Sequence, residues 1–369
     1  TEIYTLSLHD ALPICPMNTL LLSPLPPPSG GIARWTERYT AWCKTRAEVT
    51  VVNTAVSGQR IQQAGASKHL LDEACRAIRI LSDTRKAIRQ GHFDVMHLNT
   101  SCSHVGIFRD LLCARQAYKT GISIVVQCHC NIEDQLGNDR FARKAFKEIA
   151  DKAAYVLTLN QPSLAYVQQV SKTPAGICPN FLLREQIARQ HDIQDQLRTV
   201  VYVGDVCISK GSREVLKAAA MLPEVHFRLI GSVAQEIADM TCPANTTFVG
   251  SLEQEDVKKE LDAADVFVFP SYSEGFSQAL LEAMARGVPI IASDVGANRD
   301  MIEDEGGVIL DSISADAIVQ ALNRIKKPQI RADMSAWNIK KVQQTYDYDA
   351  TMHNLMNLYE KVCYDETKN

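Results

Sequence analysis

The stretch VFVFPSYSEGFSQALLEAMARGVP, residues 266–289, contains a short strand, a polar loop and a helix in direct succession. Its four leading apolar residues, 266–269, are typical of a strand that is covered on both faces of a parallel sheet. Ser277 begins the helix, and Gly287 ends it. A strand that leads through a loop into a helix is half of a βαβ unit, so this stretch predicts an α/β fold with a parallel sheet.

The same alternation of strands and helices begins at Met17 and falls into two blocks, which a mostly polar stretch at 182–198 separates. The predicted strands are 19–23, 49–53, 94–98, 122–127, 154–159 and 175–178 in the first block, and 199–203, 225–230, 246–249, 265–269, 289–292 and 307–310 in the second. The predicted helices are 32–47, 68–90, 105–119, 140–151, 161–170, 211–221, 254–263, 277–287 and 314–326. We therefore predict two Rossmann-like parallel-sheet domains, 17–181 and 182–345, that face each other across a cleft, and a final helix over 346–362. Ligands of open parallel sheets bind where the strands end and the loops lead into helices.

Length and composition exclude several classes of protein. The chain has 369 residues, which at about 150 residues per domain favours two domains. Its hydrophobic content is 46% and its formal net charge is −4, so it is neither a disordered chain nor a strongly basic nucleic-acid binder. Since no apolar run reaches about 18 residues, we expect no membrane-spanning helix. The eleven scattered cysteines predict free thiols in a reducing, cytoplasmic compartment.

The first sixteen residues, TEIYTLSLHDALPICP, differ in character from the rest of the chain. They lack the basic start and long apolar core of a secretory signal. They resemble translated sequencing adapter, so we expect 1–16 to be a non-native extension outside the fold. A loosely held N-terminal arm is the alternative.

Two strand–helix loops have features of an anion site. The first contains Gly30 and Gly31 directly before a helix, where the backbone can approach a ligand and the helix N-terminus offers free N–H groups. The second places Lys210 at the start of a helix, where it can meet a phosphate. A tight turn and a surface lysine are the alternative interpretations. The chain lacks G-x-G-x-x-G and G-x-x-x-x-G-K-[ST], which disfavours a dinucleotide dehydrogenase and a P-loop ATPase.

The stretch at 266–289 carries two carboxylates, Glu274 in the loop and Glu282 eight residues later in the helix. This spacing does not stack them for joint acid–base work. We expect both to face the cleft, with the backbone amides of 275–277 between them. Carboxylates accept hydrogen bonds from hydroxyl groups and amides hold an anion, so the arrangement suits a nucleotide-sugar. A solvated or capping glutamate is the alternative for either residue.

The run E-G-F-x4-L-E-A-M-A-x-G-x-P resembles the E-x7-E signature of the retaining GT-B glycosyltransferases of family 4. Further segments resemble the same family in the same order, namely Pro24–Gly31, Asp94–Asn99, His129, Pro179–Asn180, Gly204–Gly211 and Val295–Gly296. The resemblance implies a GT-B fold whose final helix, 346–362, crosses back onto the first domain.

The resemblance also implies roles for individual residues. Glu282 would bind the ribose hydroxyls of the donor, and Glu274 would bind hydroxyls of the transferred sugar. His129 would lie near the reacting carbon, which makes His129 and Glu274 the candidate catalytic residues. The donor-binding set would be Gly30, Gly31, Lys210, Gly275, Phe276, Ser277 and Glu282.

One position departs from the family pattern. Asp205 stands where the family usually has an arginine that helps to neutralise the donor diphosphate. A carboxylate beside a diphosphate is repulsive unless it points away or contacts a hydroxyl. Arg213 or Arg299 could substitute, or Lys210 and the amides could suffice. This departure keeps open a non-catalytic nucleotide-sugar-binding protein of the same fold, and a sugar-nucleotide epimerase is a further alternative.

The expected activity is retaining transfer of a hexose-type sugar from a UDP- or GDP-sugar to a saccharide or lipid-linked acceptor, in polysaccharide or glycoconjugate assembly. Front-face attack is favoured because no carboxylate is placed by sequence as a nucleophile. No cofactor or obligatory metal is expected. The D-x-D at Asp347–Asp349 is interpreted as a helix start, and Cys128-His129-Cys130 has no second ligand pair at zinc spacing.

The acceptor side would lie in the first domain. The helix near 140–153 carries five basic residues with Phe141, Phe146 and Ile149 between them. Such a helix can rest on an anionic membrane, at its inner face, or can simply pack its apolar side on the sheet. Asn99 ends a strand at the cleft and could touch ligand, whereas His97 and His104 are expected to be structural.

Overall fold

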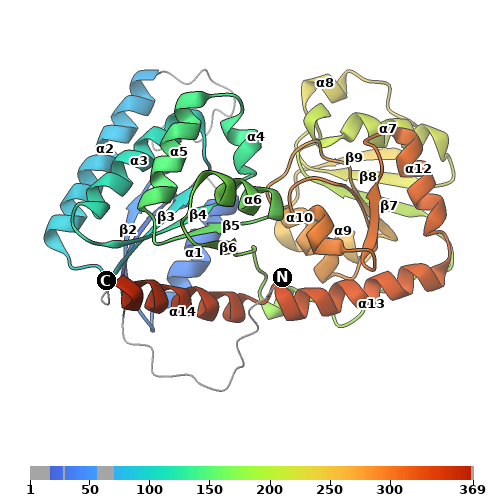
Figure 1. Cartoon of the computed structure of the whole chain (residues 1–369). Coiled ribbons are helices and arrows are strands. Elements are labelled where there is room, and N and C mark those ends of the chain that lie inside the picture. The colour runs from blue at the N-terminus through green and yellow to red at the C-terminus, as the bar shows by residue number, and fades with distance from the viewer. Residues whose placement is uncertain (1–16, 28–29, 56–69, 367–369) are drawn as a thin grey trace.

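The structure, a computed structural model, describes residues 17–27, 30–55 and 70–366, and contains two six-stranded sheets in which every strand pair is parallel. The first sheet has the order β2-β1-β3-β4-β5-β6 and the second β12-β11-β10-β7-β8-β9. Helices cover both sheets, and the two α/β units stand side by side (Figure 1). The segment 1–16, expected to be a non-native extension, lies outside the described residues.

The strands of the first unit are β1 (Asn18–Ser23), β2 (Glu48–Asn53), β3 (Val95–Thr100), β4 (Ser123–Cys128), β5 (Tyr155–Thr158) and β6 (Ala175–Ile177). Its helices are α1 (Gly31–Cys43), α2 (Leu70–Gln90), α3 (His104–Tyr118), α4 (Ile132–Leu136), α5 (Arg140–Lys152) and α6 (Gln161–Val170). The central strands β3 and β4 are buried at every residue, as expected of strands with helices on both faces.

The strands of the second unit are β7 (Thr199–Val203), β8 (His226–Ile230), β9 (Thr246–Gly250), β10 (Val266–Phe269), β11 (Ile290–Ser293) and β12 (Gly307–Leu310). Its helices are α7 (Ser212–Met221), α8 (Gln235–Ala238), α9 (Gln254–Asp262), α10 (Gln278–Ala285), α11 (Asn298–Ile302), α12 (Ala315–Arg324) and α13 (Pro328–Thr345), with short 3₁₀ turns η2 (Arg184–Gln186) and η3 (Ile208–Lys210). All twelve predicted strands are present, six in each sheet, which confirms the predicted α/β fold.

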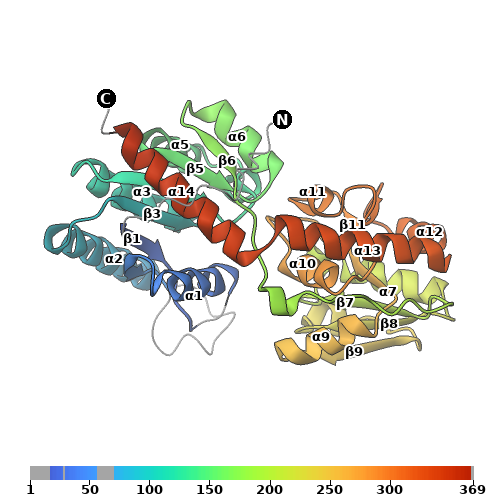
Figure 2. The same ribbon diagram turned by 90° about the horizontal axis from the view of Figure 1, so that it is seen from below.

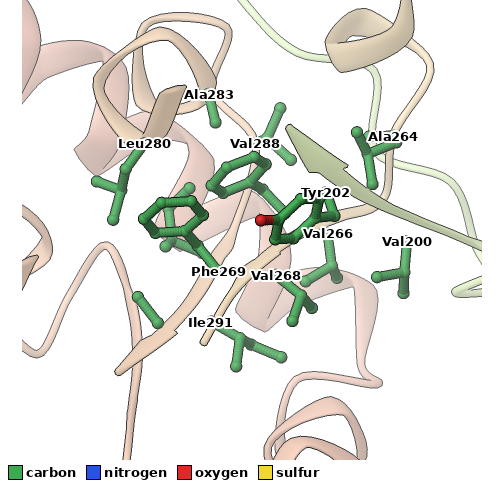
Figure 3. Close-up of a cluster of buried hydrophobic side chains, with 14 of the residues drawn as sticks. Val200, Tyr202, Ala264, Val266, Val268, Phe269, Leu280, Ala283, Val288 and Ile291 are labelled. Atoms are coloured by element: carbon green, nitrogen blue, oxygen red, sulfur yellow. The ribbon is translucent and has the colours of Figure 1, made fainter. Parts of the chain in front are cut away.

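The apolar strand at 266–269 forms the centre of the second core. Val266, Val268 and Phe269 of β10 pack with Tyr202 of β7 and Leu280 of α10 (Figure 3). Tyr202 and Phe269 stack with ring centroids 6.0 Å apart. The helix after the E-G-F loop is therefore fixed by burial of one face.

The last helix, α14 (Tyr348–Glu366), leaves the second unit and packs on the first (Figure 2). Its residues Met352, Leu355, Met356 and Tyr359, spaced as one helix face, join the buried cluster around β1 and α1. The helix that was expected to cross back does so, and it begins and ends a few residues later than predicted.

Three parts of the secondary structure differ from the sequence prediction. The predicted helix 32–47 ends at Cys43, because Glu48 already pairs with Asn18 in the sheet. The short helices α4, α8 and α11 were not predicted, since four or five residues are too few for a recognisable period. The 18-residue helix α13 was also missed.

Buried polar residues explain why α13 was missed. Arg331 and Asn338 lie inside the protein, where an apolar period would be expected. Arg331 donates to the carbonyl of Lys326 at 2.6 Å, and the Asn338 amide donates to the carbonyls of Val288 and Gly306. These side chains satisfy neighbouring loops, so they interrupt the apolar pattern without disturbing the helix.

Among the residues that the structure describes, no helix combines the length and the apolar character needed to cross a bilayer.

Candidate functional site

A cavity of about 790 Å³ opens between the two units, at the end where the strands run into their helices. The first unit contributes Gly30, Gly31 and the first turns of α1. The second unit contributes Lys210, the loop before α10 and α10 itself. The predicted donor-binding residues on this wall are Lys210, Phe276, Ser277 and Glu282, joined by the candidate catalytic Glu274, whereas Gly275 is not among the lining residues. The structure therefore brings residues from both blocks of the sequence to one site, as expected for ligands of parallel sheets.

Lys210 and Glu274 form an ion pair inside this cavity. Lys210 Nζ lies 2.6 Å from Glu274 Oε1, with side-chain exposures of 30% and 12%. Lys210 ends η3, and Gly211 follows it with a positive φ of 76°. A Cβ at Gly211 would meet the carbonyl oxygen of Pro270 at 2.1 Å, so glycine is required where the lysine loop passes the loop after β10.

Glu282 projects from α10 on the side opposite the buried Leu280 and Met284. Ser277 caps α10 by accepting a hydrogen bond from the Leu280 N–H at 3.2 Å. Glu282 and Gln278 are one turn apart and both line the cavity. Burial raises the pKa of Glu282, and the charge of Arg34 on α1 opposes this rise.

The E-G-F loop rests directly on the first unit. A Cβ at Gly275 would lie 2.9 Å from the Cα of Cys130, so the two backbones touch. Asn160 donates a hydrogen bond to the Gly275 carbonyl at 2.8 Å, and Ser273 donates to Asp134 at 2.7 Å. Gly275 is needed here for this close approach between the units, a role that its position in the motif does not reveal.

His129 follows β4 and is half-buried beside α1. Its Nε2 lies 2.8 Å from Asn99 Oδ1, and its ring meets the Trp35 ring edge-on at 5.6 Å between centroids. Trp35 lines the cavity, whereas His129 and Asn99 are not among the lining residues. Burial, and then the nearby His97, lower the pKa of His129 to about 3, so the ring is neutral at physiological pH.

Asn99 connects His129 to the interior of the first unit. Its amide donates to Ser23 Oγ at 2.9 Å, and its Oδ1 also faces Nε2 of His97 at 3.0 Å. Because Oδ1 only accepts, both imidazoles carry their proton on Nε2. His97 Nδ1 then accepts from the hydroxyl of Tyr359 on α14. His97 is thus structural, as predicted; His104 lies at the surface, 3.2 Å from Asp139.

Asp205 lines the cavity, and its carboxylate accepts a hydrogen bond from Ser232 Oγ at 2.7 Å. The two arginines suggested as substitutes do not line the cavity. Arg213 pairs with Glu214 at 2.9 Å, and Arg299 pairs with Asp294 at 2.7 Å. The suggestion that either arginine replaces the family cation is therefore not supported by its position.

Two cationic residues of the cavity were missed by the sequence analysis. Arg34 and Arg38 of α1 line the cavity next to Gly30 and Gly31. A signal was available, since arginines one turn apart follow the glycine pair on a helix that starts at the cleft.

The D-x-D lies away from the cavity. Asp347 accepts from Arg184 at 2.7 Å and from the Ala350 N–H at 2.9 Å, at the start of α14. Asp349 accepts from the indole N–H of Trp42 at 3.2 Å. Both carboxylates thus have structural partners at a helix start, as predicted.

Known structures share this two-sheet architecture. A sucrose-phosphate synthase from Thermosynechococcus elongatus superposes with a TM-score of 0.74, covering 94% of this chain and 99% of that one at 18% identity. Anabaena HepE in complex with UDP and glucose gives a TM-score of 0.71, covering 94% and 100% at 15% identity. The fold is GT-B.

The second half of the chain matches a known protein family by sequence. Residues 184–342 match the family described as glycosyl transferases group 1. A putative teichuronic acid biosynthesis glycosyltransferase, TuaC of Bacillus subtilis, is 26% identical over 236 residues, which are 60% of this chain. The match spans 59% of the length of that relative. The segment that matches the family contains Lys210, Glu274 and Glu282.

Proposed function

We propose that the protein transfers a hexose-type sugar from a nucleoside-diphosphate donor, a UDP- or GDP-sugar, to a saccharide or lipid-linked acceptor with retention of the anomeric configuration. The observation that carries this proposal is the cavity between the two units. It brings Lys210, Glu274 and Glu282 opposite the glycine pair at 30–31. The match of 184–342 to glycosyl transferases group 1 supports the same class of reaction.

In the proposed donor complex, Glu282 accepts hydrogen bonds from the ribose hydroxyls and Glu274 from hydroxyls of the sugar. The backbone amides at 275–277 and the Lys210 ammonium contact the diphosphate. Lys210 is already 2.6 Å from Glu274. The ammonium therefore lies between the proposed sugar site and the proposed phosphate site. It can keep one N–H on Glu274 and turn another toward the diphosphate when the donor binds.

The proposed reaction is a front-face displacement. The bond from the anomeric carbon to the phosphate oxygen breaks, and the bond to the acceptor oxygen forms on the same face of the sugar. The acceptor proton passes to the departing phosphate oxygen. Negative charge grows on the leaving group, so Lys210 and the amides act where electrostatic stabilisation lowers the barrier most.

We propose that the reaction needs no cofactor and no obligatory divalent metal. The D-x-D carboxylates are held by Arg184, Trp42 and the start of α14, away from the cavity. Charge on the leaving group would instead be met by cationic side chains and amides of the cavity wall.

A thermal-shift panel of UDP, GDP, ADP and CMP, with their common sugars, tests the donor site. A ligand present at a hundredfold excess over its Kd stabilises the native state by about 2.7 kcal/mol, so one nucleotide should raise the Tm clearly. Glu282→Ala should remove the shift, and the exposed Glu224→Ala should keep it. Wild-type protein that responds to none of the nucleotides would contradict the proposal.

The carboxylate of Asp205 in the cavity favours one second candidate, a nucleotide-sugar-binding protein without turnover. Incubation with the nucleotide-sugar found in the panel and a set of acceptors separates the two. Release of nucleoside diphosphate that depends on an acceptor indicates transfer, whereas binding without release indicates the second candidate.

We further propose that the first unit docks on an anionic membrane surface that carries the acceptor. The Phe141 side chain of α5 is 78% exposed, and Arg140 and Lys144 flank it at the surface. Helix α3 lies beside α5 (Figure 1). Its side chains Phe108 and Leu112 are also exposed. Apolar side chains beside cationic ones suit insertion between anionic headgroups. Phe141→Ser should reduce co-sedimentation with phosphatidylglycerol vesicles, and pure phosphatidylcholine vesicles should not bind.

A further inference from the structure

We infer that Arg34 and Arg38 of α1 bind the diphosphate of the donor. They would replace the arginine that the resembling family usually has at the position of Asp205. This inference rests on the proposed function and names further residues of the same site. It assigns the main phosphate-binding charge to the first unit, across the cavity from the family-matching segment.

The two arginines share one face of α1. They are four residues apart, and both line the cavity together with Gly30 and Gly31. A Cβ built on either glycine would meet no atom of the described residues within 4 Å, so these residues leave room for a ligand beside the start of the helix. A group bound there would lie within reach of both guanidinium groups.

The opposite wall is poorly equipped for a diphosphate. Among the lining residues from the second unit, the carboxylates are Asp205, Glu274 and Glu282, and the cation is Lys210. Lys210 is already paired with Glu274 at 2.6 Å. The hydrogen bond from Ser232 holds Asp205 in place but leaves its negative charge. The charged side chains of this wall, three carboxylates and one cation, therefore oppose a diphosphate, and the backbone amides must work against them.

Arg34 and Arg38 reverse this balance on the side of α1. The helix adds two guanidinium groups and one carboxylate, Glu37, to the cavity lining. Guanidinium groups bind phosphate oxygens in a bidentate way and stay charged at any physiological pH. The charge of Arg34 also reaches Glu282, the proposed ribose ligand, across the cavity. The phosphates of a nucleoside diphosphate adjoin the ribose, so a guanidinium group near the proposed ribose ligand suits phosphate binding.

Isothermal titration with UDP and GDP, and with uridine and guanosine as uncharged counterparts, tests the inference. The double variant Arg34→Gln/Arg38→Gln should weaken binding of the preferred diphosphate by about tenfold to a hundredfold. Binding of the matching nucleoside should stay within about twofold, because it has no phosphate for the arginines to hold. Lys44→Gln, which removes one charge from the exposed end of the same helix, should leave both affinities unchanged.

A rescue variant tests whether Arg34→Gln and Arg38→Gln act through lost charge or through a changed cavity shape. Adding Asp205→Arg to the double variant should restore much of the diphosphate affinity, since it returns a cation to the cavity. The inference is overturned if the double variant binds diphosphate as wild type does, or loses nucleoside and diphosphate equally. If wild type binds neither UDP nor GDP, the proposed function fails first and this inference fails with it.

Discussion

The imidazole of His129 donates its Nε2 proton to Oδ1 of Asn99, over 2.8 Å, and this bond leaves Nδ1 as the acceptor nitrogen of a neutral ring. The same Asn99 oxygen accepts from His97, which accepts in turn from Tyr359 of the final helix. The orientation of His129 is therefore set by a buried polar chain that begins on α14.

Asn99→Ala should destabilise the protein and disorder His129. The substitution leaves two imidazole N–H groups without their partner, at a cost of about 1–3 kcal/mol for each buried group left unpaired, whereas Ser23 keeps its hydrogen bond with Thr36. Urea unfolding measures the loss, and Asn138→Ala, at an exposed position, serves as the control. An unchanged unfolding midpoint would show that water replaces the amide.

Acidification should destabilise the fold before carboxylates titrate. Burial lowers the pKa of His97 to about 4 and that of His129 to about 3, against 6.5 for a free histidine. Between these values the unfolded chain binds protons that the native state does not, so stability falls as pH falls below about 6.5, by up to about 1.4 kcal/mol per pH unit for each ring. Unfolding midpoints at pH 7.5, 6 and 5 test this. His97→Gln should flatten the slope; equal slopes in both proteins would contradict the assignment.

Lys210→Met and Glu274→Gln should separate donor binding from turnover. Loss of the ammonium removes a phosphate contact and should weaken nucleoside-diphosphate affinity by about tenfold. Glu274→Gln keeps the ammonium and the shape, so the affinity for the diphosphate alone should hold while sugar transfer slows. Calorimetry with UDP and GDP, followed by an assay of nucleoside-diphosphate release, distinguishes the two. Equal losses of affinity in both variants would indicate that the pair acts only as a structural brace.

Gly275→Ala should push the two units apart. Its Cβ would lie 2.9 Å from the Cα of Cys130, a contact that backbone atoms cannot accommodate without movement. The radius of gyration from small-angle scattering should rise, and nucleotide affinity should fall. Gly31→Ala, whose Cβ would meet no atom within 4 Å in the part of the chain that the structure describes, is the matched control and should keep the wild-type radius. A Gly275→Ala protein with the wild-type radius would mean that the loop yields instead.

The spacing of apolar residues predicted the fold well, because buried strands appear as short apolar runs and amphipathic helices repeat their apolar residues every three to four positions. Where buried polar side chains donate to loop carbonyls, as Arg331 and Asn338 do in α13, the period disappears and the helix was missed. The motif residues Lys210, Glu274 and Glu282 were placed at one cavity by their positions at strand ends. Their ion pairing was not predictable, since 64 residues separate Lys210 from Glu274.

Arg34 and Arg38 of α1 are a second example of site residues that the sequence analysis did not find. A family pattern directs attention to residues 205, 213 and 299 of the second unit. The arginine pair after the two glycines was visible in the sequence, but which residues of the other unit it faces across the cavity is a property of the assembled fold.

The packing of α14 has a consequence for how the chain matures during synthesis. The sheet of β1–β6 leaves the ribosome first, yet Met352, Leu355 and Tyr359, which complete its buried cluster, are made last. Until then the face that α14 covers stays open to solvent, and His97 lacks its tyrosine partner. The half that emerges first is consequently the half that finishes folding last, so a ribosome stalled before residue 348 should hold an incomplete, protease-sensitive first unit.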